Sequence, residues 1–112
     1  MRVNEDLYTD QGCTFSHTIP VYGINDEPFN LTGYSARGQI RKSYTSTNFV
    51  AFTCTVQGSS VVISLTANQT RAMKPGRYLY DVEIYNASNN VIRIAQGIFE
   101  IDPSVIKLQP NP

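Results

Sequence analysis

Few side chains in this sequence are of the types that carry out catalysis. Its single histidine, His17, lies on the apolar side of an alternating stretch, where a histidine is more often packed than catalytic. Serines and carboxylates are present, but their spacing does not set a nucleophile beside a base. We therefore expect no enzyme activity, and His17 is the best remaining residue to replace in testing that expectation.

Metal and cofactor sites have equally little support. Cys13, Cys54 and the lone histidine lack the spacings of zinc ligands. The turn at residues 25–27 lacks the alternating oxygen ligands of a calcium loop. No glycine-rich phosphate loop precedes a helix. We expect no metal, no cofactor and no catalytic residue.

The two cysteines are predicted to be free thiols. Residues 1–6 contain no apolar signal region, and disulfides are typical of secreted proteins. We expect Cys13 and Cys54 to pack as small hydrophobic residues. A single disulfide between them stays an alternative if their strands meet. No apolar run approaches the ~20 residues that a membrane-spanning helix needs, so we expect no membrane contact.

Charge is balanced overall but unevenly placed. Nine basic residues cancel nine acidic ones, which removes the usual argument for nucleic-acid binding. No carboxylate lies between Glu27 and Asp81, whereas these basic residues do: Arg37, Arg41, Lys42, Arg71, Lys74 and Arg77. Two interpretations remain open. The surface is polarised and presents a basic patch or associates head to tail, or the fold interleaves the segments and cancels the polarity.

Alternation of apolar and polar residues with period two dominates the chain and indicates half-buried strands. The alternating stretches are residues 14–22, 34–42, 49–56, 61–65, 77–85 and 91–101. Pro20 cannot donate to a strand ladder, so the first stretch is predicted to be an edge or bulged strand. Gly97 indicates a bulge or a close approach of another backbone. Residues 57–60 are predicted to form a hairpin turn.

One short helix is predicted after Thr66, which can cap residues 67–73 before Pro75 and Gly76 end them. Together these elements predict an all-β fold, an antiparallel immunoglobulin-like β-sandwich of about seven strands with one short helical turn. A small β-barrel is the competing fold. The sandwich spans residues 1–102, and residues 103–112 form a proline-containing C-terminal tail.

An interaction surface is predicted from residues that fall outside the inward faces of these strands. Seven tyrosines and five phenylalanines occur, and tyrosine and arginine are favoured anchors of protein interfaces. The tyrosines outside the inward faces are Tyr8, Tyr22, Tyr44 and Tyr85. The candidate interface residues are Arg37, Arg41, Leu79, Tyr85 and Pro20. An error in strand register would also explain an outward Leu79, and arginines with aromatic rings could instead stack on nucleic-acid bases.

Several motifs occur in an order that resembles a known family. They are DQG at residues 10–12, TF at 14–15, PFNLTGY at 28–34, ARGQIR at 36–41, ISLTA at 63–67 and PGRYLYDVE at 75–83. This order resembles the small immunoglobulin-like virion structural proteins of tailed bacteriophages, in particular those of marine cyanobacterial phages. It is also similar to the N-terminal domain of siphophage upper baseplate proteins. The resemblance covers about residues 7–102.

The resemblance implies a non-catalytic structural protein, made in the host cytoplasm and located in the virion as a tail, baseplate or neck component. It implies protein–protein contacts with other virion proteins, and a homo-oligomer is a further expectation. Baseplate proteins continue beyond this domain, whereas here only the tail follows, which favours a free-standing subunit. The alternatives left open are a capsid decoration protein and a β-sandwich module that binds carbohydrate or nucleic acid.

Overall fold

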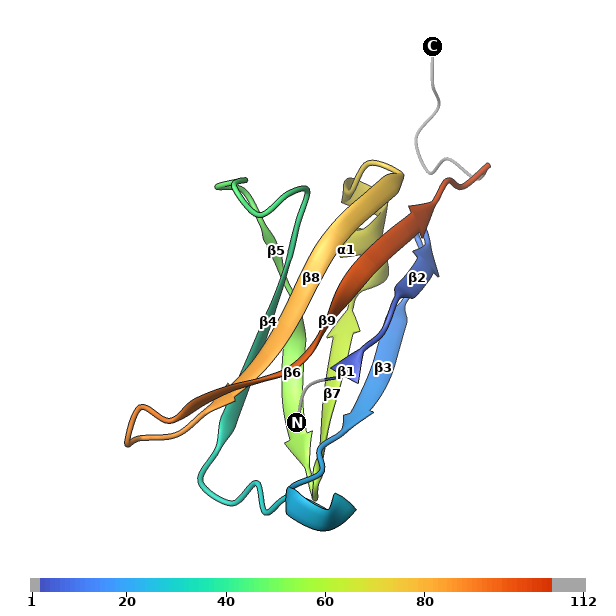
Figure 1. The fold of residues 1–112 in the computed structure, drawn as a ribbon. Coiled ribbons are helices and arrows are strands. Elements are labelled where there is room, and N and C mark those ends of the chain that lie inside the picture. The colour runs from blue at the N-terminus through green and yellow to red at the C-terminus, as the bar shows by residue number, and fades with distance from the viewer. Residues whose placement is uncertain (1–2, 106–112) are drawn as a thin grey trace.

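The computed structural model describes residues 3–105. Two β-sheets pack face to face, and a short helix closes one end between them (Figure 1). Sheet A has the strand order β1-β9-β8-β4-β5, with β2 also paired to β9, and sheet B has the order β3-β7-β6. In chain order the strands and helices are β1 (Val3–Asn4), β2 (Leu7–Asp10), β3 (Phe15–Pro20), a 3₁₀ turn (Ile24–Asp26), β4 (Ser35–Arg41), β5 (Val50–Ala51), β6 (Thr53–Gln57), β7 (Ser60–Leu65), α1 (Ala67–Ala72), β8 (Gly76–Tyr85) and β9 (Val91–Asp102).

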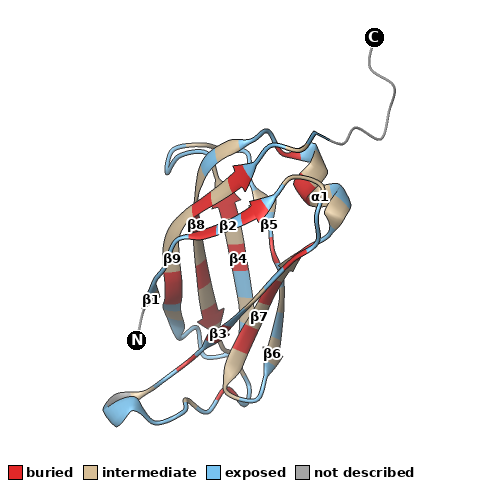
Figure 2. Ribbon diagram, turned by 90° about the vertical axis from the view of Figure 1, so that its right-hand side faces the viewer, coloured by how far each residue is buried: buried red, intermediate tan, exposed pale blue. Residues whose placement is uncertain are grey.

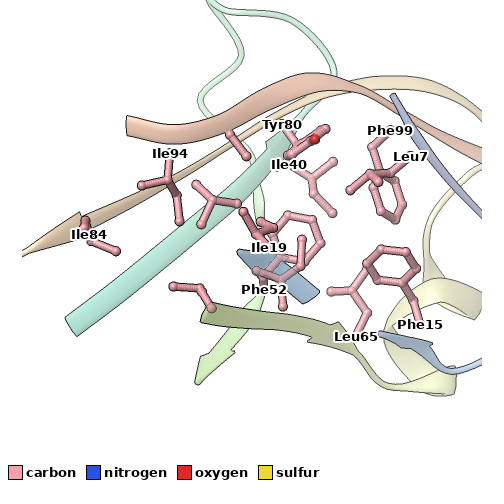
Figure 3. Close-up of a cluster of buried hydrophobic side chains, with 14 of the residues drawn as sticks. Leu7, Phe15, Ile19, Ile40, Phe52, Leu65, Tyr80, Ile84, Ile94 and Phe99 are labelled. Atoms are coloured by element: carbon pink, nitrogen blue, oxygen red, sulfur yellow. The ribbon is translucent and has the colours of Figure 1, made fainter. Parts of the chain in front are cut away.

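The predicted alternation is confirmed, because the apolar positions of the strands face the space between the sheets (Figure 2). Phe15, Phe52 and Phe99 form an aromatic cluster in this space (Figure 3). The rings of Phe15 and Phe99 meet edge to face with centroids 5.0 Å apart, and those of Phe52 and Phe99 lie 5.7 Å apart. Edge-to-face contact is the favoured arrangement of buried rings, so this cluster joins the two sheets. The edge position predicted for the strand with Pro20 is also confirmed, since β3 borders sheet B.

Residues 49–56 do not form the single strand that their alternation predicts. Val50 and Ala51 pair with β4 in sheet A, whereas Thr53–Gln57 pairs with β7 in sheet B. Phe52 lies at the crossing, and its amide still donates to the Gly38 carbonyl at 3.0 Å. The side chains keep one inward face through the crossing, so alternation alone cannot reveal that the chain changes sheets.

The N-terminal residues add two strands that the alternation analysis missed. Both β1 and β2 pair with β9 in parallel, so the expectation of a purely antiparallel sandwich is wrong at this edge. Leu7 and Thr9 are buried while Tyr8 and Asp10 are exposed. A four-residue strand is too short for its alternation to stand out from chance. With the divided stretch, the described chain has nine strands where about seven were expected.

The bulge of β9 lies at Ile94, not at Gly97. The pairing of β8 with β9 shifts between Val82, opposite Ala95, and Glu83, opposite Arg93, which leaves Ile94 as the extra residue. For Gly97 the other predicted explanation, a close approach of another backbone segment, is confirmed. A Cβ atom built on it would lie 2.2 Å from the Glu5 carbonyl oxygen.

The helix and the start of β8 identify the sandwich type. Thr66 and Gln69 form the predicted cap reciprocally, since the Thr66 hydroxyl accepts from the Gln69 amide and the Gln69 side chain accepts from the Thr66 amide. Just beyond the helix, the Tyr78 hydroxyl donates to the Lys74 carbonyl at 2.6 Å. A tyrosine bonded back to the chain at this corner is a hallmark of immunoglobulin-like sandwiches. Together with the two-sheet strand order, it confirms an all-β immunoglobulin-like fold.

The two cysteines are free thiols in different surroundings. Cys54 is half-buried, as expected of a small hydrophobic residue, but Cys13 is exposed in the turn after β2, so its predicted burial is wrong. Turn residues at the end of a sandwich have no opposing sheet to cover them. The last strand ends at Asp102, and residues 106–112 of the predicted tail lie outside the described part of the chain.

Two weakly acidic groups, the half-buried Cys54 thiol and the buried Tyr80 hydroxyl, predict a loss of stability in alkali. Burial raises the pKa of the Cys54 thiol from 9.0 to about 11. Burial, and then the charges of Glu5 and Asp6, raise the pKa of the Tyr80 hydroxyl well above 10.0. The unfolded chain therefore releases these protons at lower pH than the folded chain. We expect the free energy of unfolding to be unaffected by them below about pH 8 and to fall as the pH rises beyond the unfolded values.

Urea unfolding between about pH 8 and about pH 11 measures this effect. Above the unfolded pKa, Tyr80 contributes a slope of about 1.4 kcal/mol per pH unit, which Tyr80→Phe should remove. Tyr8→Phe, at an exposed position, is the matched control. Cys54 adds a slope of its own above its unfolded pKa of 9.0. The assignment to Tyr80 would therefore be contradicted if the slope at about pH 11 were as steep in Tyr80→Phe as in Tyr8→Phe.

Candidate interaction surface

Four of the five predicted interface residues lie together on the outer face of sheet A. In the ladder between β4 and β8, Arg37 is opposite Glu83 and Arg41 is opposite Leu79. Tyr85 ends β8 on the same face, opposite Ser35. Their neighbours Ile40, Tyr80 and Val82 point into the core, so strand alternation alone places these side chains outward. The outward position predicted for Leu79 therefore reflects the register correctly.

Arg37 fixes one aromatic ring on this surface. Its Nε lies 2.5 Å from Oε1 of Glu83, and its guanidinium carbon lies 4.3 Å from the centre of the Tyr85 ring. An exposed ion pair of this kind adds little stability. Its main consequence is geometric, because the guanidinium is held over the ring and reduces the number of positions that the ring can adopt.

Arg41 does the same for Phe49 and for the loop that joins β4 to β5. Its guanidinium carbon lies 5.1 Å from the centre of the Phe49 ring, which is 49% exposed. The same group donates to the Ser46 carbonyl and, at 2.9 Å, to Oε1 of Gln39. A single arginine thus holds an exposed ring and a loop in one arrangement.

A hollow of about 260 Å³ opens between these elements. Leu79 contributes to its lining, and Ile98 lies opposite Leu79 on β9. Tyr44, 84% exposed, stands at the rim. The remaining lining residues are Gln39, Arg41, Ser43, Tyr80 and Asp81. An aliphatic floor with a polar and aromatic rim resembles the centre of a protein interface.

Pro20 does not belong to this surface. It ends β3, at the border of sheet B, opposite Ser60. It is exposed, but it lies in the other sheet. The five predicted residues therefore divide into one cluster of four and one separate edge position.

The interleaving interpretation of the charges is confirmed for two basic residues of the middle segment, Arg37 and Arg77, each of which meets a carboxylate of the C-terminal strands. Besides Arg37 with Glu83, Nε of Arg77 lies 3.8 Å from Oε1 of Glu100, and Nε of Arg93 lies 3.8 Å from Oδ2 of Asp81. The acidic residues of the C-terminal part of the chain lie in β8 and β9, and β8 pairs with β4 of the basic middle segment. Other basic groups donate to main-chain oxygens instead, Lys42 to Arg77 and Arg71 to Gly12.

The residues considered for catalysis and metal binding do not gather. His17 is half-buried at the margin of the sandwich, and its Nε2 lies 3.3 Å from Oε1 of Glu5. Within residues 3–105, no three histidine, cysteine, aspartate or glutamate side chains come together as a metal-binding group. The helix in this same part of the chain is too short to span a membrane.

Sequence reasoning missed Ile98 and Phe49 as members of this surface. Ile98 was missed because the bulge at Ile94 reverses the alternation of β9 partway along. The signal was present in the sequence: the apolar positions change from even (Ile92, Ile94) to odd (Ala95, Phe99, Ile101). Phe49 precedes the chain crossing and had no assigned face.

Comparisons with known proteins add little to this geometry. No family model and no curated protein matches the chain. Among solved structures, a pair of titin immunoglobulin domains is 14% identical with a TM-score of 0.48, over 91% of this chain and 45% of that one. An internalin-like protein of Listeria monocytogenes is 18% identical with a TM-score of 0.48, over 92% of this chain and 28% of that one. The chain thus spans less than half the length of each.

Proposed function

We propose that this chain is a non-catalytic binding module that docks on another protein through the outer face of sheet A. We further propose, from the order of its sequence motifs, that it does so as a structural component of a tailed-phage particle, with other virion proteins as partners. A tail, baseplate or neck position agrees best with the motifs, and a capsid decoration protein is the alternative position.

The arrangement of side chains around the hollow carries the docking proposal. Two arginines hold the rings of Tyr85 and Phe49 in place on the face that carries the half-buried, outward-facing aliphatic pair Leu79 and Ile98. Aromatic and arginine anchors near the middle of a face are the residues that dominate binding energy in interfaces. Because these side chains are already held in place, they lose less conformational entropy when a partner docks.

The ion pairs of this face favour a protein over a nucleic acid as partner. Glu83, Asp81 and Glu100 stand among the arginines. A nucleic-acid surface needs a continuous positive field along the phosphates, and carboxylates between the arginines interrupt such a field.

Incorporation of a tagged chain into particles tests both parts of the proposal. The tagged chain is expressed during infection by the phage that encodes it, and purified particles are analysed by quantitative mass spectrometry. Leu79→Asp should lower incorporation at least about tenfold, because it buries a charge at the centre of the contact. Val62→Asp is the matched control, since Val62 is a half-buried, outward residue on the central strand of sheet B.

The outcomes separate the two parts. Absence of the tagged wild-type chain from particles would contradict the virion assignment. Equal incorporation of Leu79→Asp and Val62→Asp would contradict docking through sheet A. Circular dichroism of both purified variants verifies that each is folded.

A further inference from the structure

One side of the sandwich is built from an uncharged part of the chain. No acidic, basic or histidine residue occurs at residues 43–70, which include β5, β6 and β7. Within residues 3–105, strand β6 is the border of sheet B, with β7 on its one paired side (Figure 2). It contains no charge, proline or glycine. Soluble proteins usually protect such edges with charges, proline or bulges, because an open edge pairs readily with another strand.

The opposite border of sheet B is protected. Strand β3 ends in Pro20, which has no amide hydrogen to donate. Its His17 lies beside Glu5, which brings a charged group to that margin. The two borders of sheet B thus differ, because β3 is protected against pairing with another strand and β6 is open to it.

Hairpin geometry identifies the free main-chain groups of β6. Gln57 and Ser60 flank a two-residue turn and face each other, and such flanking residues form a hydrogen-bonded pair. Alternation along an antiparallel ladder then directs the main-chain groups of Thr55 toward β7 and those of Cys54 and Val56 toward the open edge. The Phe52 amide is already bonded to the Gly38 carbonyl, so the free edge begins after it.

We propose that two copies of this chain pair through antiparallel β6 strands around a two-fold axis at Thr55. In this register Cys54 lies opposite Val56 of the partner subunit, so the free main-chain groups of both copies are satisfied. Shifting the register by two residues would instead place the occupied Phe52 amide, or the turn at Gly58, opposite a free group. The three-stranded sheets B of the two copies become one continuous sheet.

A second copy fits this edge because symmetric pairing brings each side chain near its own counterpart. A charged residue at the axis would repel itself, and β6 has none. Threonine pairs across strands favourably, and Thr55 is exposed on the outer face. This inference goes beyond the docking surface and does not rest on it, since β6 belongs to sheet B and the hollow lies on sheet A.

The first experiment measures molar mass by sedimentation equilibrium from about 1 µM to about 1 mM, because a single strand pair is a small interface. We expect the mass to rise from that of the 12.5 kDa chain to twice that value. Thr55→Lys should remain monomeric throughout. Thr18→Lys is the matched control and should dimerise like the wild type. It adds the same charge to the same face of sheet B but in strand β3, because Thr18 and Thr55 lie opposite Val62 from its two sides.

Three results would overturn the proposal: a wild-type chain that stays monomeric at the highest concentration, a Thr55→Lys variant that dimerises normally, or a Thr18→Lys variant that loses the dimer as well. Unfolding curves of both lysine variants show whether each is folded.

A cross-link tests the register directly. Thr55 and its counterpart would form a non-hydrogen-bonded pair, whose Cα separation of about 4.5 Å suits a disulfide. In a Cys13→Ser background, which removes the exposed thiol, Thr55→Cys should form a covalent dimer under mild oxidation. Thr18→Cys in the same background should stay monomeric. Equal cross-linking of the two variants would refute the register.

The two proposals fail separately. Leu79→Asp should keep the wild-type dimer, and Thr55→Lys should keep the outer face of sheet A intact. A chain that is monomeric but enters particles through Leu79 would contradict the dimer alone.

Discussion

Phe99→Ala is expected to lower the free energy of unfolding by about 4 kcal/mol, within the range measured when a buried phenylalanine is truncated. Phe99 is fully buried, with 0% of its surface exposed. It contacts Phe15 of sheet B and the crossing residue Phe52, so its loss opens a cavity between the two sheets. Both faces of that cavity belong to paired strands, which limits how far it can collapse.

Chemical denaturation followed by circular dichroism measures the loss. Phe49→Ala is the matched control, because the same atoms are removed from a ring that is 49% exposed. We expect Phe49→Ala to lower the free energy of unfolding by less than about 1 kcal/mol, since most surface substitutions have small effects. Similar losses in the two variants would contradict the view that the aromatic cluster joins the sheets.

Gly97→Ala is expected to destabilise the protein by about 3 kcal/mol through a contact with the main chain. The added Cβ would lie 2.2 Å from the Glu5 carbonyl oxygen. That oxygen also accepts from the Tyr80 hydroxyl at 2.5 Å, and the Asp6 side chain accepts from the Ile98 amide. The N-terminal segment must therefore move away from β9 and lose these bonds.

Gly33→Ala is the control for this prediction. Gly33 has a φ of +82°, but nothing lies within 4 Å of a Cβ built on it. Alanine there should cost only the conformational penalty of about 1 kcal/mol. Hydrogen exchange adds a readout specific to Gly97, because Gly97→Ala should selectively expose the amides of β1 and β2. Equal losses of stability at the two glycines would contradict the close approach.

The two proposed surfaces have different consequences for assembly. The hollow beside Leu79 is on the outer face of sheet A, whereas β6 borders sheet B. A dimer formed through β6 would present two sheet A faces related by a two-fold axis. A symmetric unit of this kind suits attachment to a symmetric particle, where each copy can engage an equivalent site.

The sequence by itself determined which face of most strands is buried. Alternation in residues 61–65 and 77–85 placed Val61, Ile63 and Tyr80 inward correctly, because the period of two in a strand is a local property of the backbone. The cap at Thr66 and the turn at Gly58 also follow from neighbouring residues alone. The outward position of Leu79, Arg37 and Arg41 could be predicted for the same reason.

Only the tertiary structure decided which strands are neighbours. The division of residues 49–56 at Phe52 and the parallel pairing of β1 and β2 with β9 leave the alternation unchanged. They depend on which partner offers free main-chain groups and fits the core, and those partners lie far away in the sequence. The guanidinium of Arg37 over Tyr85 and the open edge of β6 arise in the same way. Local patterns set the face of a side chain, and long-range packing sets what that side chain touches.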